Sequence, residues 1–223
     1  MRFARPVWFA LLAVLLSACS SGSGWDSRQN EHVVRRGETL YSIAWRYDRR
    51  PEDLARWNNL GDGSLIYPGQ ILRLTPSGSS ASTSSPVPKR TPLPEIREVP
   101  PPGWDWPSKG PVDVRFGGKP GSGTGILISG RAGEPVRAAA SGRVVYAGSG
   151  LIGYGQLIIL KHNDTYLSAY GYNESVLVRE NQTIKRGQRI ATMGEGPERK
   201  PRLHFEIRRN GEPVDPERYL PAR

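Results

Sequence analysis

The sequence predicts two folded units of different class: an α+β block of order β-α-α-β over residues 32–75, and a mainly-β domain, an antiparallel sandwich or open barrel, over residues 104–223. Three observations support this division. Residues 40–57 carry apolar side chains at helical spacing between two short apolar strands. Residues 104–223 alternate short Val/Ile/Leu-rich segments with glycine turns. Residues 76–103 are dense in Ser and Pro and poor in aromatic residues, which predicts a linker with a mean span of about 30 Å.

Composition narrows the possible classes of protein. The 26 glycines and 20 prolines among 223 residues argue against a helical bundle or coiled coil. A hydrophobic share of 37% is too small for a polytopic membrane protein. The single cysteine excludes an intrachain disulfide and a cysteine-based zinc finger.

The N-terminus predicts export and lipidation. Arg2 and Arg5 flank the start of an apolar run, residues 6–16, that is shorter than the roughly 20 residues needed to span a bilayer. Leu-Ser-Ala before Cys19 resembles the bacterial lipobox, whose cysteine is acylated after the preceding peptide is removed. We therefore expect a signal peptide over residues 1–18, a lipid on Cys19 and a polar tether over residues 20–31.

The resemblance also implies a location. Ser20, where an Asp would signal retention, implies sorting to the outer membrane, with the protein facing the periplasm. The formal net charge of +10 would otherwise suggest a nucleic-acid partner. An exported lipoprotein does not meet nucleic acid, so we expect the anionic cell wall to be the polyanion that it contacts.

The first folded block reads clearly along the chain. A short strand at residues 32–35 is followed by Thr39, a suitable N-cap for a helix beginning at Leu40. Pro51 and the two acids after it open a second helix, which ends at Asn58 and Asn59. A second strand is expected at residues 71–74.

The motifs VVRRGETLYSIAWRY and IYPGQILRL, with the Asn pair between them, resemble the LysM domain over the whole block. The resemblance implies that the block binds N-acetylglucosamine-containing glycan strands of peptidoglycan in a shallow groove between two loops. Trp45, Tyr47 and Trp57 can serve either as packing residues or as sugar-stacking platforms, and we favour packing. The residues expected to contact the glycan are Gly37, Glu38, Thr39, Leu40, Leu65, Ile66, Tyr67, Pro68 and Gly69.

The second unit resembles the LytM/lysostaphin-type zinc endopeptidases. Strands are expected in the segments VDVRF, GILIS, GRVVYAG, GQLIILKH, TYLSAY, SVLVRE, QRIATMG and RLHFEIRR. The segments PVRAAASGRVVYAGSGLIGYGQLIILKHND, YLSAYGYN, IKRGQRIATMG and LHFEIRRNGEPVDPERYL carry the resemblance, which covers essentially the whole domain.

That family implies a zinc ion held by an H-x-x-x-D pair and the second His of an H-x-H pair, with two more histidines assisting catalysis. The corresponding positions here are Gly123, Leu127, Tyr172 and Arg202, and only His204 is retained. A guanidinium about 4 Å from a divalent cation is repelled by roughly 8 kcal/mol at an effective dielectric of 20. We therefore expect no metal, no cofactor and no catalytic residue.

The other ionisable residues of interest do not suggest a replacement site. His32 and His162 lie at the edges of strands, where hydrogen bonding explains them. Asp113, Asp164 and Glu206 lack the spacing to a histidine that a metal site of this kind needs.

The order of lipobox, LysM block and degenerate LytM-type domain resembles the NlpD-type murein hydrolase activator lipoproteins. The resemblance implies a non-catalytic partner of periplasmic N-acetylmuramoyl-L-alanine amidases, acting in daughter-cell separation. We expect the groove around Tyr154, Tyr172, Arg202 and His204 to contact the amidase. The basic run at residues 199–202 either steers an acidic partner or is a solvated loop.

Two alternatives remain at this point. The chain could be an active zinc endopeptidase that cleaves peptidoglycan cross-links through ligands not recognised in the sequence. It could also be a passive wall tether, in which the LysM block acts and the β-domain is inert.

Overall fold

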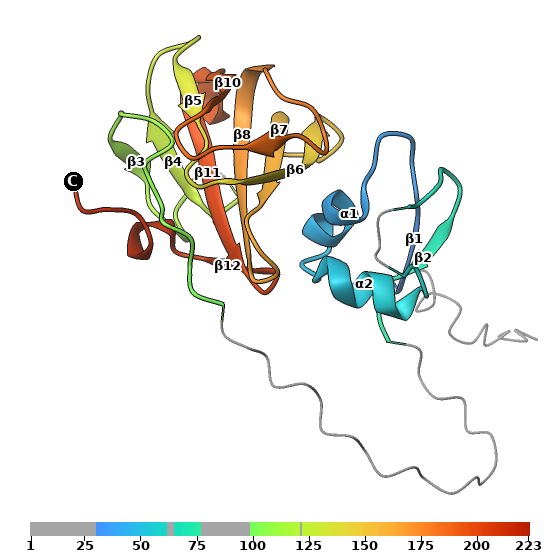
Figure 1. Cartoon of the computed structure of the whole chain (residues 1–223). Helices are drawn as coiled ribbons and strands as arrows, with labels where there is room; N and C mark the ends of the chain where they lie inside the picture. Colours follow the sequence, from blue (N-terminus) through green and yellow to red (C-terminus); the bar gives the residue numbers. More distant parts are fainter. Residues whose placement is uncertain (1–29, 62–64, 77–98, 121) are drawn as a thin grey trace, which may run out of the picture.

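The computed structural model describes residues 30–61, 65–76, 99–120 and 122–223, and Figure 1 shows them as two units side by side. The expected signal peptide, the lipidated Cys19, nearly all of the tether and most of the linker lie outside the described residues. None of the helices that the structure describes is long and apolar enough to cross a membrane.

The first unit has the predicted β-α-α-β order. Strand β1 (Glu31–Val33) pairs antiparallel with β2 (Ile71–Arg73), and α1 (Leu40–Arg46) and α2 (Pro51–Trp57) lie between them in sequence. Thr39 caps α1 in a reciprocal capping box with Ser42, as its residue type predicts. Helix α2 begins with Pro51 at its first position and ends at Trp57, with Asn58 as its C-cap. The core of the unit consists of Val34, Leu40, Ile43, Ala44, Leu54, Ala55, Leu72 and Leu74.

The second unit is built on an antiparallel sheet with ten strands among the described residues. Its central path runs in the order β3-β4-β11-β8-β7-β6-β9, with β10 pairing both β5 and β8, and β12 pairing β11. The strands are β3 (Val112–Val114), β4 (Ile126–Ser129), β5 (Pro135–Arg137), β6 (Gly142–Gly148), β7 (Gln156–Lys161), β8 (Tyr166–Val176), β9 (Thr183–Ile184), β10 (Arg189–Met193), β11 (Arg202–Arg209) and β12 (Glu212–Val214). Among residues 99–120 and 122–223, the helical segments are the short 3-10 turns Pro197–Arg199 and Pro216–Arg218.

The expectation of a separate strand over residues 175–180 was wrong. Strand β8 instead continues to Val176, because its last residues leave β7 and pair with β10. The short strands β5 and β12 were not expected. Asn210 and Gly211, both with positive φ, form the turn between β11 and β12, and the Asn-Gly pair is a hairpin signal that was present in the sequence.

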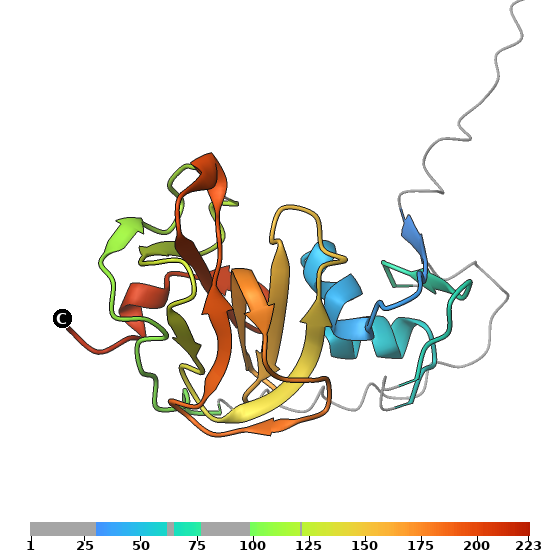
Figure 2. The ribbon, with the colours of Figure 1, turned by 90° about the horizontal axis from the view of Figure 1, so that it is seen from above.

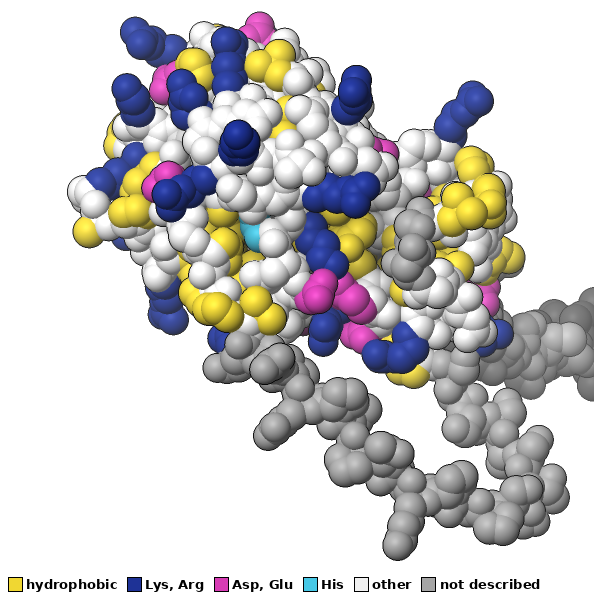
Figure 3. Space-filling model, viewed as in Figure 1, with side chains coloured by type: hydrophobic (Ala, Val, Ile, Leu, Met, Phe, Trp, Pro, Cys, Tyr) yellow, Lys and Arg dark blue, Asp and Glu magenta, His cyan; other side chains and the backbone are white. Residues whose placement is uncertain are grey.

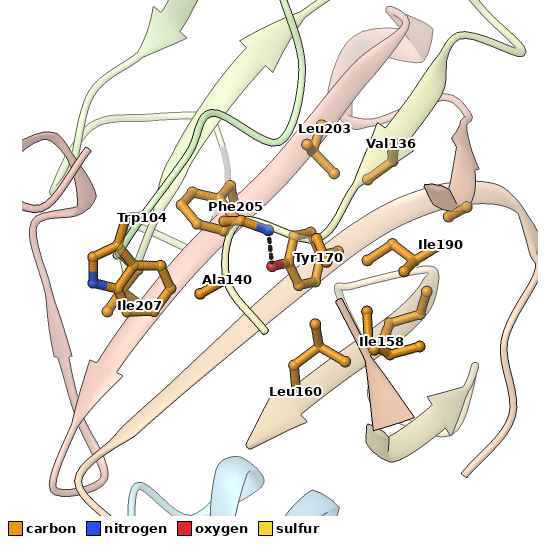
Figure 4. Close-up of a cluster of buried hydrophobic side chains, with 14 of the residues drawn as sticks. Trp104, Val136, Ala140, Ile158, Leu160, Tyr170, Ile190, Leu203, Phe205 and Ile207 are labelled. Carbon is orange, nitrogen blue, oxygen red and sulfur yellow. Dashed lines mark hydrogen bonds between the residues drawn. The ribbon is translucent and has the colours of Figure 1, made fainter. Parts of the chain in front are cut away.

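The main core of the second unit lies on one face of this sheet and is shown in Figure 4. Tyr170 and Phe205, on neighbouring strands, pack with ring centroids 5.4 Å apart, and Trp104 covers the cluster nearby. The buried hydroxyl of Tyr170 accepts a 2.8 Å hydrogen bond from the backbone N–H of Ala139, so the one polar atom of that ring is satisfied.

The opposite face of the sheet is also apolar. Ile158 and Leu160 of β7 belong to the main core, whereas Leu157 and Ile159 point the other way and are fully buried as well. Trp45 of α1 packs into this second group, which we call the interdomain cluster: Trp45, Tyr146, Leu151, Leu157, Ile159, Leu167 and Ala169. The two ribbon views accordingly place α1 next to β6 and its neighbours (Figures 1 and 2).

Candidate functional site

The candidate site is built on β11, whose side chains alternate between two buried faces. Leu203, Phe205 and Ile207 point into the main core. The intervening side chains point to the other face, and each of these residues is at most 4% exposed. We call them the charged row: Arg202, His204, Glu206 and Arg208.

His204 lies at the centre of this row. Its strand position is opposite Leu127 of β4 on one side and Gly171 of β8 on the other. The rings of Tyr154 and Tyr172 meet the imidazole edge-on, with centroid distances of 5.2 and 5.8 Å. The structure therefore brings together all the residues that the sequence predicts for a partner groove except Arg202, which lies two positions away on the same face.

Gly125 allows the neighbouring strand to approach this closely. A Cβ atom at residue 125 would lie 2.5 Å from the carbonyl oxygen of Phe205 and 2.9 Å from the Cε1 atom of His204. Contacts that short do not occur for real Cβ atoms, so only glycine fits here.

Glu206 holds the row together. Its carboxylate accepts hydrogen bonds from His204 Nε2 at 3.2 Å, Thr124 Oγ1 at 2.8 Å and Arg208 Nε at 2.7 Å. Burial alone would raise the pKa of Glu206, but the hydrogen bond from His204 and the charge of Arg208 hold that pKa below its usual value. Sequence reasoning gave Glu206 no histidine partner. The spacing of two on a strand was the signal, because it puts both side chains on one face.

Arg202 occupies one end of the row in an unusual environment. Its Nη2 atom forms ion pairs with Asp113 and, at 3.6 Å, with Glu198. The side chain is only 5% exposed, yet its Nε and Nη1 atoms have no hydrogen-bond partner within the described part of the chain. The guanidinium therefore has unused donors, to which an acidic group could bind only if the side chain became exposed.

The residues expected at the zinc-binding positions do not fit a zinc ion. Gly123 offers no side chain, and Leu127 is 2% exposed and offers only carbon. Arg202 brings a permanent positive charge, and His204 Nε2 is bonded to Glu206. Over residues 30–61, 65–76, 99–120 and 122–223, no group of three or more His, Cys, Asp or Glu side chains is placed to hold a metal.

Arg208, at the other end of the charged row, contacts the first unit. Its Nη1 atom is 2.9 Å from Asp48 Oδ1, and its guanidinium lies 3.9 Å from the centroid of the Trp45 ring. Burial opposes the charge of Arg208, but Glu206 and Asp48 raise the pKa of its guanidinium above the usual value. A cavity of about 250 Å³ lies between the two units beside this contact. It is lined by Trp45, Arg46, Asp48, Thr124, Leu151, Ile152, Tyr154 and Arg208.

The second loop of the expected glycan groove is fixed to the segment that leads into the first loop, because the backbone N–H of Gly69 donates to the carbonyl of Val34 at 2.8 Å. Leu65 and Tyr67 are 62% and 59% exposed and can contact a sugar. Glu38 has an internal role instead, since its carboxylate binds His32 Nε2 at 2.7 Å and Arg46. Leu40 belongs to the core of the unit.

The histidines outside the site have structural partners. His32 is bonded to Tyr47 and Glu38. His162 donates from Nδ1 to the carbonyl of Ser141 and lies 2.8 Å from Ser168 Oγ through Nε2. Burial lowers the pKa of His162 to about 4. Tyr47 and Trp57 pack against the core of the first unit, so both have packing positions.

Comparison with known proteins identifies both units. The LysM domain model matches residues 32–75, and the model of peptidase family M23 matches residues 121–216. The lipoprotein NlpD/LppB homolog of Pseudomonas aeruginosa is 42% identical, over 86% of this chain and 77% of the relative.

Two relatives come from Escherichia coli K12. The uncharacterized lipoprotein YgeR is 37% identical over 94% of this chain and 90% of its own length. The murein hydrolase activator NlpD is 56% identical over 54% of this chain, and the match spans 32% of that longer protein.

Proposed function

The chain belongs to the NlpD/LppB family of lipoproteins, with a LysM domain followed by an M23 domain, and we propose that it activates a cell-wall amidase without cleaving peptidoglycan itself. The observation that carries this proposal is the set of side chains on and beside β11. By the resemblance of the sequence motifs, we infer that Gly123, Leu127, Tyr172 and Arg202 occupy the positions at which the peptidase family has zinc ligands and catalytic histidines. The fold is kept, and its cleft offers a binding surface.

The proposed partner is an N-acetylmuramoyl-L-alanine amidase. Tyr154 and Tyr172 are half-buried beside His204 and present apolar rings with polar tips, a combination that suits a protein interface. Arg202 supplies unused donors for an acidic group of the partner. Activation follows if the groove binds the amidase more tightly in its open state than in its closed state.

We infer from the remaining parts of the chain that this activity takes place at the wall. The exposed Leu65 and Tyr67 support binding of glycan strands by the LysM domain. A lipid on Cys19 would anchor the chain to the outer membrane, facing the periplasm. Lys and Arg side chains are spread over the face of the M23 domain shown in Figure 3, which suits an acidic wall or an acidic partner.

The test is release of stem peptides from purified sacculi by a purified amidase, with and without this chain. We expect no release by the chain alone and a clear stimulation of the amidase. Arg202→Met should lower the stimulation at least tenfold, whereas Arg179→Met, which changes an exposed arginine outside the basic run at residues 199–202, should leave it within twofold.

Two results would contradict the proposal. Stoichiometric zinc together with clearing of sacculi by the chain alone would identify an endopeptidase. Stimulation that survives deletion of residues 104–223 would show that the M23 domain is not the activating part.

A further inference from the structure

The contact between the LysM and M23 domains is specific. Trp45 is 3% exposed, and the residues that bury it belong to the M23 domain, since it is part of the interdomain cluster and not of the LysM core. Arg208 donates to the carbonyl of Trp45 at 3.3 Å in addition to its ion pair with Asp48. Arg46 donates to the carbonyl of Gly150 at 3.0 Å.

The docked LysM domain limits access to one end of the cleft. Trp45, Arg46 and Asp48 form one wall of the 250 Å³ cavity, and Thr124, Tyr154 and Arg208 of the M23 domain form the other. Basic, acidic and hydrophobic side chains accordingly meet along the band between the two units in Figure 3. A partner that reaches Tyr154 along the charged row from this side would have to displace the LysM domain.

The same contact involves the first glycan loop. The hydroxyl of Thr39 donates to the carbonyl of Val145 on β6 at 3.1 Å, and only Gly37 is fully exposed among residues 37–40. A glycan strand bound by this loop would meet Thr39, whose hydroxyl is already engaged by Val145 in the docked state. Glycan binding and docking therefore draw on the same loop.

We propose that the LysM domain docked on the M23 domain masks the Tyr154–Arg208 end of the cleft, and that a wall glycan releases it by competing at the Gly37–Leu40 loop. The chain then exposes its whole groove only where peptidoglycan is present. Two sites are coupled through one two-state contact, so glycan affinity and docking must oppose each other by the same factor. The consequence for amidase activation rests on the proposed function, whereas the coupling itself does not.

The experiment uses residues 20–223, the expected mature chain without its lipidated Cys19, and a hexamer of N-acetylglucosamine as the probe. Trp45→Ala removes the centre of the contact and leaves the LysM core intact, and alanine is a good helix former at this position in α1. Asp48→Lys is a second variant that opposes Arg208 from an exposed position. Arg56→Ala, exposed and away from the contact, is the control.

Small-angle scattering should show a compact wild-type chain that expands when the hexamer is added, while both interface variants are already expanded. Because the apparent dissociation constant is the intrinsic one divided by the competent fraction, the variants should bind the hexamer at least threefold more tightly than the wild type and the control. Equal affinities, tighter binding by the wild type, unchanged scattering on addition of the hexamer, or no hexamer binding by any chain would overturn the proposal.

The amidase readout separates this inference from the proposed function. In the absence of hexamer, Trp45→Ala should stimulate the amidase on soluble muropeptides at least threefold more than the wild type. Absence of stimulation by every chain, with the scattering and affinity results as expected, would reject the activator function and keep the competition. Stimulation that is equal for wild type and variant would reject the masking.

Discussion

Replacement of Arg208 by Met tests whether the charged row is a coupled unit. Arg208 is 2% exposed and ion-paired to Glu206, which is fully buried, and to Asp48 of the LysM domain. Methionine fills much of the same volume and keeps contact with the Trp45 ring, but it leaves the carboxylate of Glu206 without its cationic partner. The remaining hydrogen-bond partners, His204 and Thr124, lack the permanent charge of a guanidinium.

The expected cost follows from the geometry. Opposite charges about 4 Å apart interact by about 4 kcal/mol at an effective dielectric of 20. Removing one member of a buried pair typically costs about 3–5 kcal/mol, because the other charge remains buried. For a domain of this size each kcal/mol lowers the melting temperature by about 4 °C, so we expect Arg208→Met to lower it by about 12–20 °C.

Thermal unfolding of the M23 domain measures this effect, and a double-mutant cycle isolates the pair. Combining Arg208→Met with Glu206→Gln should cost about 1–3 kcal/mol less than the sum of the single changes. Arg115→Met, which breaks the exposed pair with Glu217, is the matched control and should cost less than about 1 kcal/mol. Additive single effects, or a loss no larger than that of the control, would refute the coupling.

Three further predictions concern stability. Because burial lowers the pKa of His162 to about 4, the unfolded chain binds a proton more readily than the folded chain below pH 6.5. The free energy of unfolding should therefore fall by up to about 1.4 kcal/mol per pH unit between pH 6.5 and 4. His162→Asn should flatten this dependence, and a pH profile that the substitution leaves unchanged would contradict the assignment. Gly125→Ala should destabilise the M23 domain by about 1–3 kcal/mol in urea unfolding, because its Cβ atom would meet the Phe205 carbonyl at 2.5 Å. Thr39→Ala should cost the LysM domain about 1 kcal/mol through loss of the helix cap, whereas Thr39→Ser, which keeps the hydroxyl, should restore most of it.

Local chemistry was readable from the sequence where a residue acts on its own neighbours. Thr39 caps α1 and Pro51 opens α2, as their types and positions predict. The strands of the M23 domain were predicted from the alternation of apolar and polar residues. The errors occur where the end of a strand depends on which strand pairs with it. Strand β8 extends past its predicted end because β10 supplies a partner for Ser175 and Val176, and that partner is not visible in the local pattern.

The site was predictable in part for the same reason. Resemblance to a family placed His204, Tyr172 and Leu127 in one cleft, and the register of β11 with β4 and β8 brings them together. The hydrogen bonds of Glu206 to both His204 and Arg208 were not predicted. The sequence was searched for the spacings of known zinc-binding motifs, and that search does not ask which side chains share one face of a strand. The contact of Arg208 with Asp48 joins residues far apart in sequence, and no local pattern predicts it.

One sequence signal did point to the contact between domains. Leu157 to Leu160 of β7 are four consecutive apolar residues, a pattern typical of a strand that is buried on both faces. An antiparallel sheet with one core would need only every second residue to be apolar. The second apolar face therefore requires a cover, and Trp45 of the LysM domain supplies part of it.

The charged row is better explained by binding than by stability. Replacing buried ion pairs with apolar residues is often neutral or stabilising, so β11 does not need charges on this face to hold the sheet. Its neighbours on the main-core face show that the strand readily carries Leu203, Phe205 and Ile207. The charges instead differ along the row: Arg208 is fully engaged by Glu206 and the LysM domain, whereas Arg202 retains unused donors. The row is therefore asymmetric: its Arg208 end is fully paired, whereas at its Arg202 end two buried donors have no partner among the described residues, so that an acidic partner would have to expose this side chain in order to bind it.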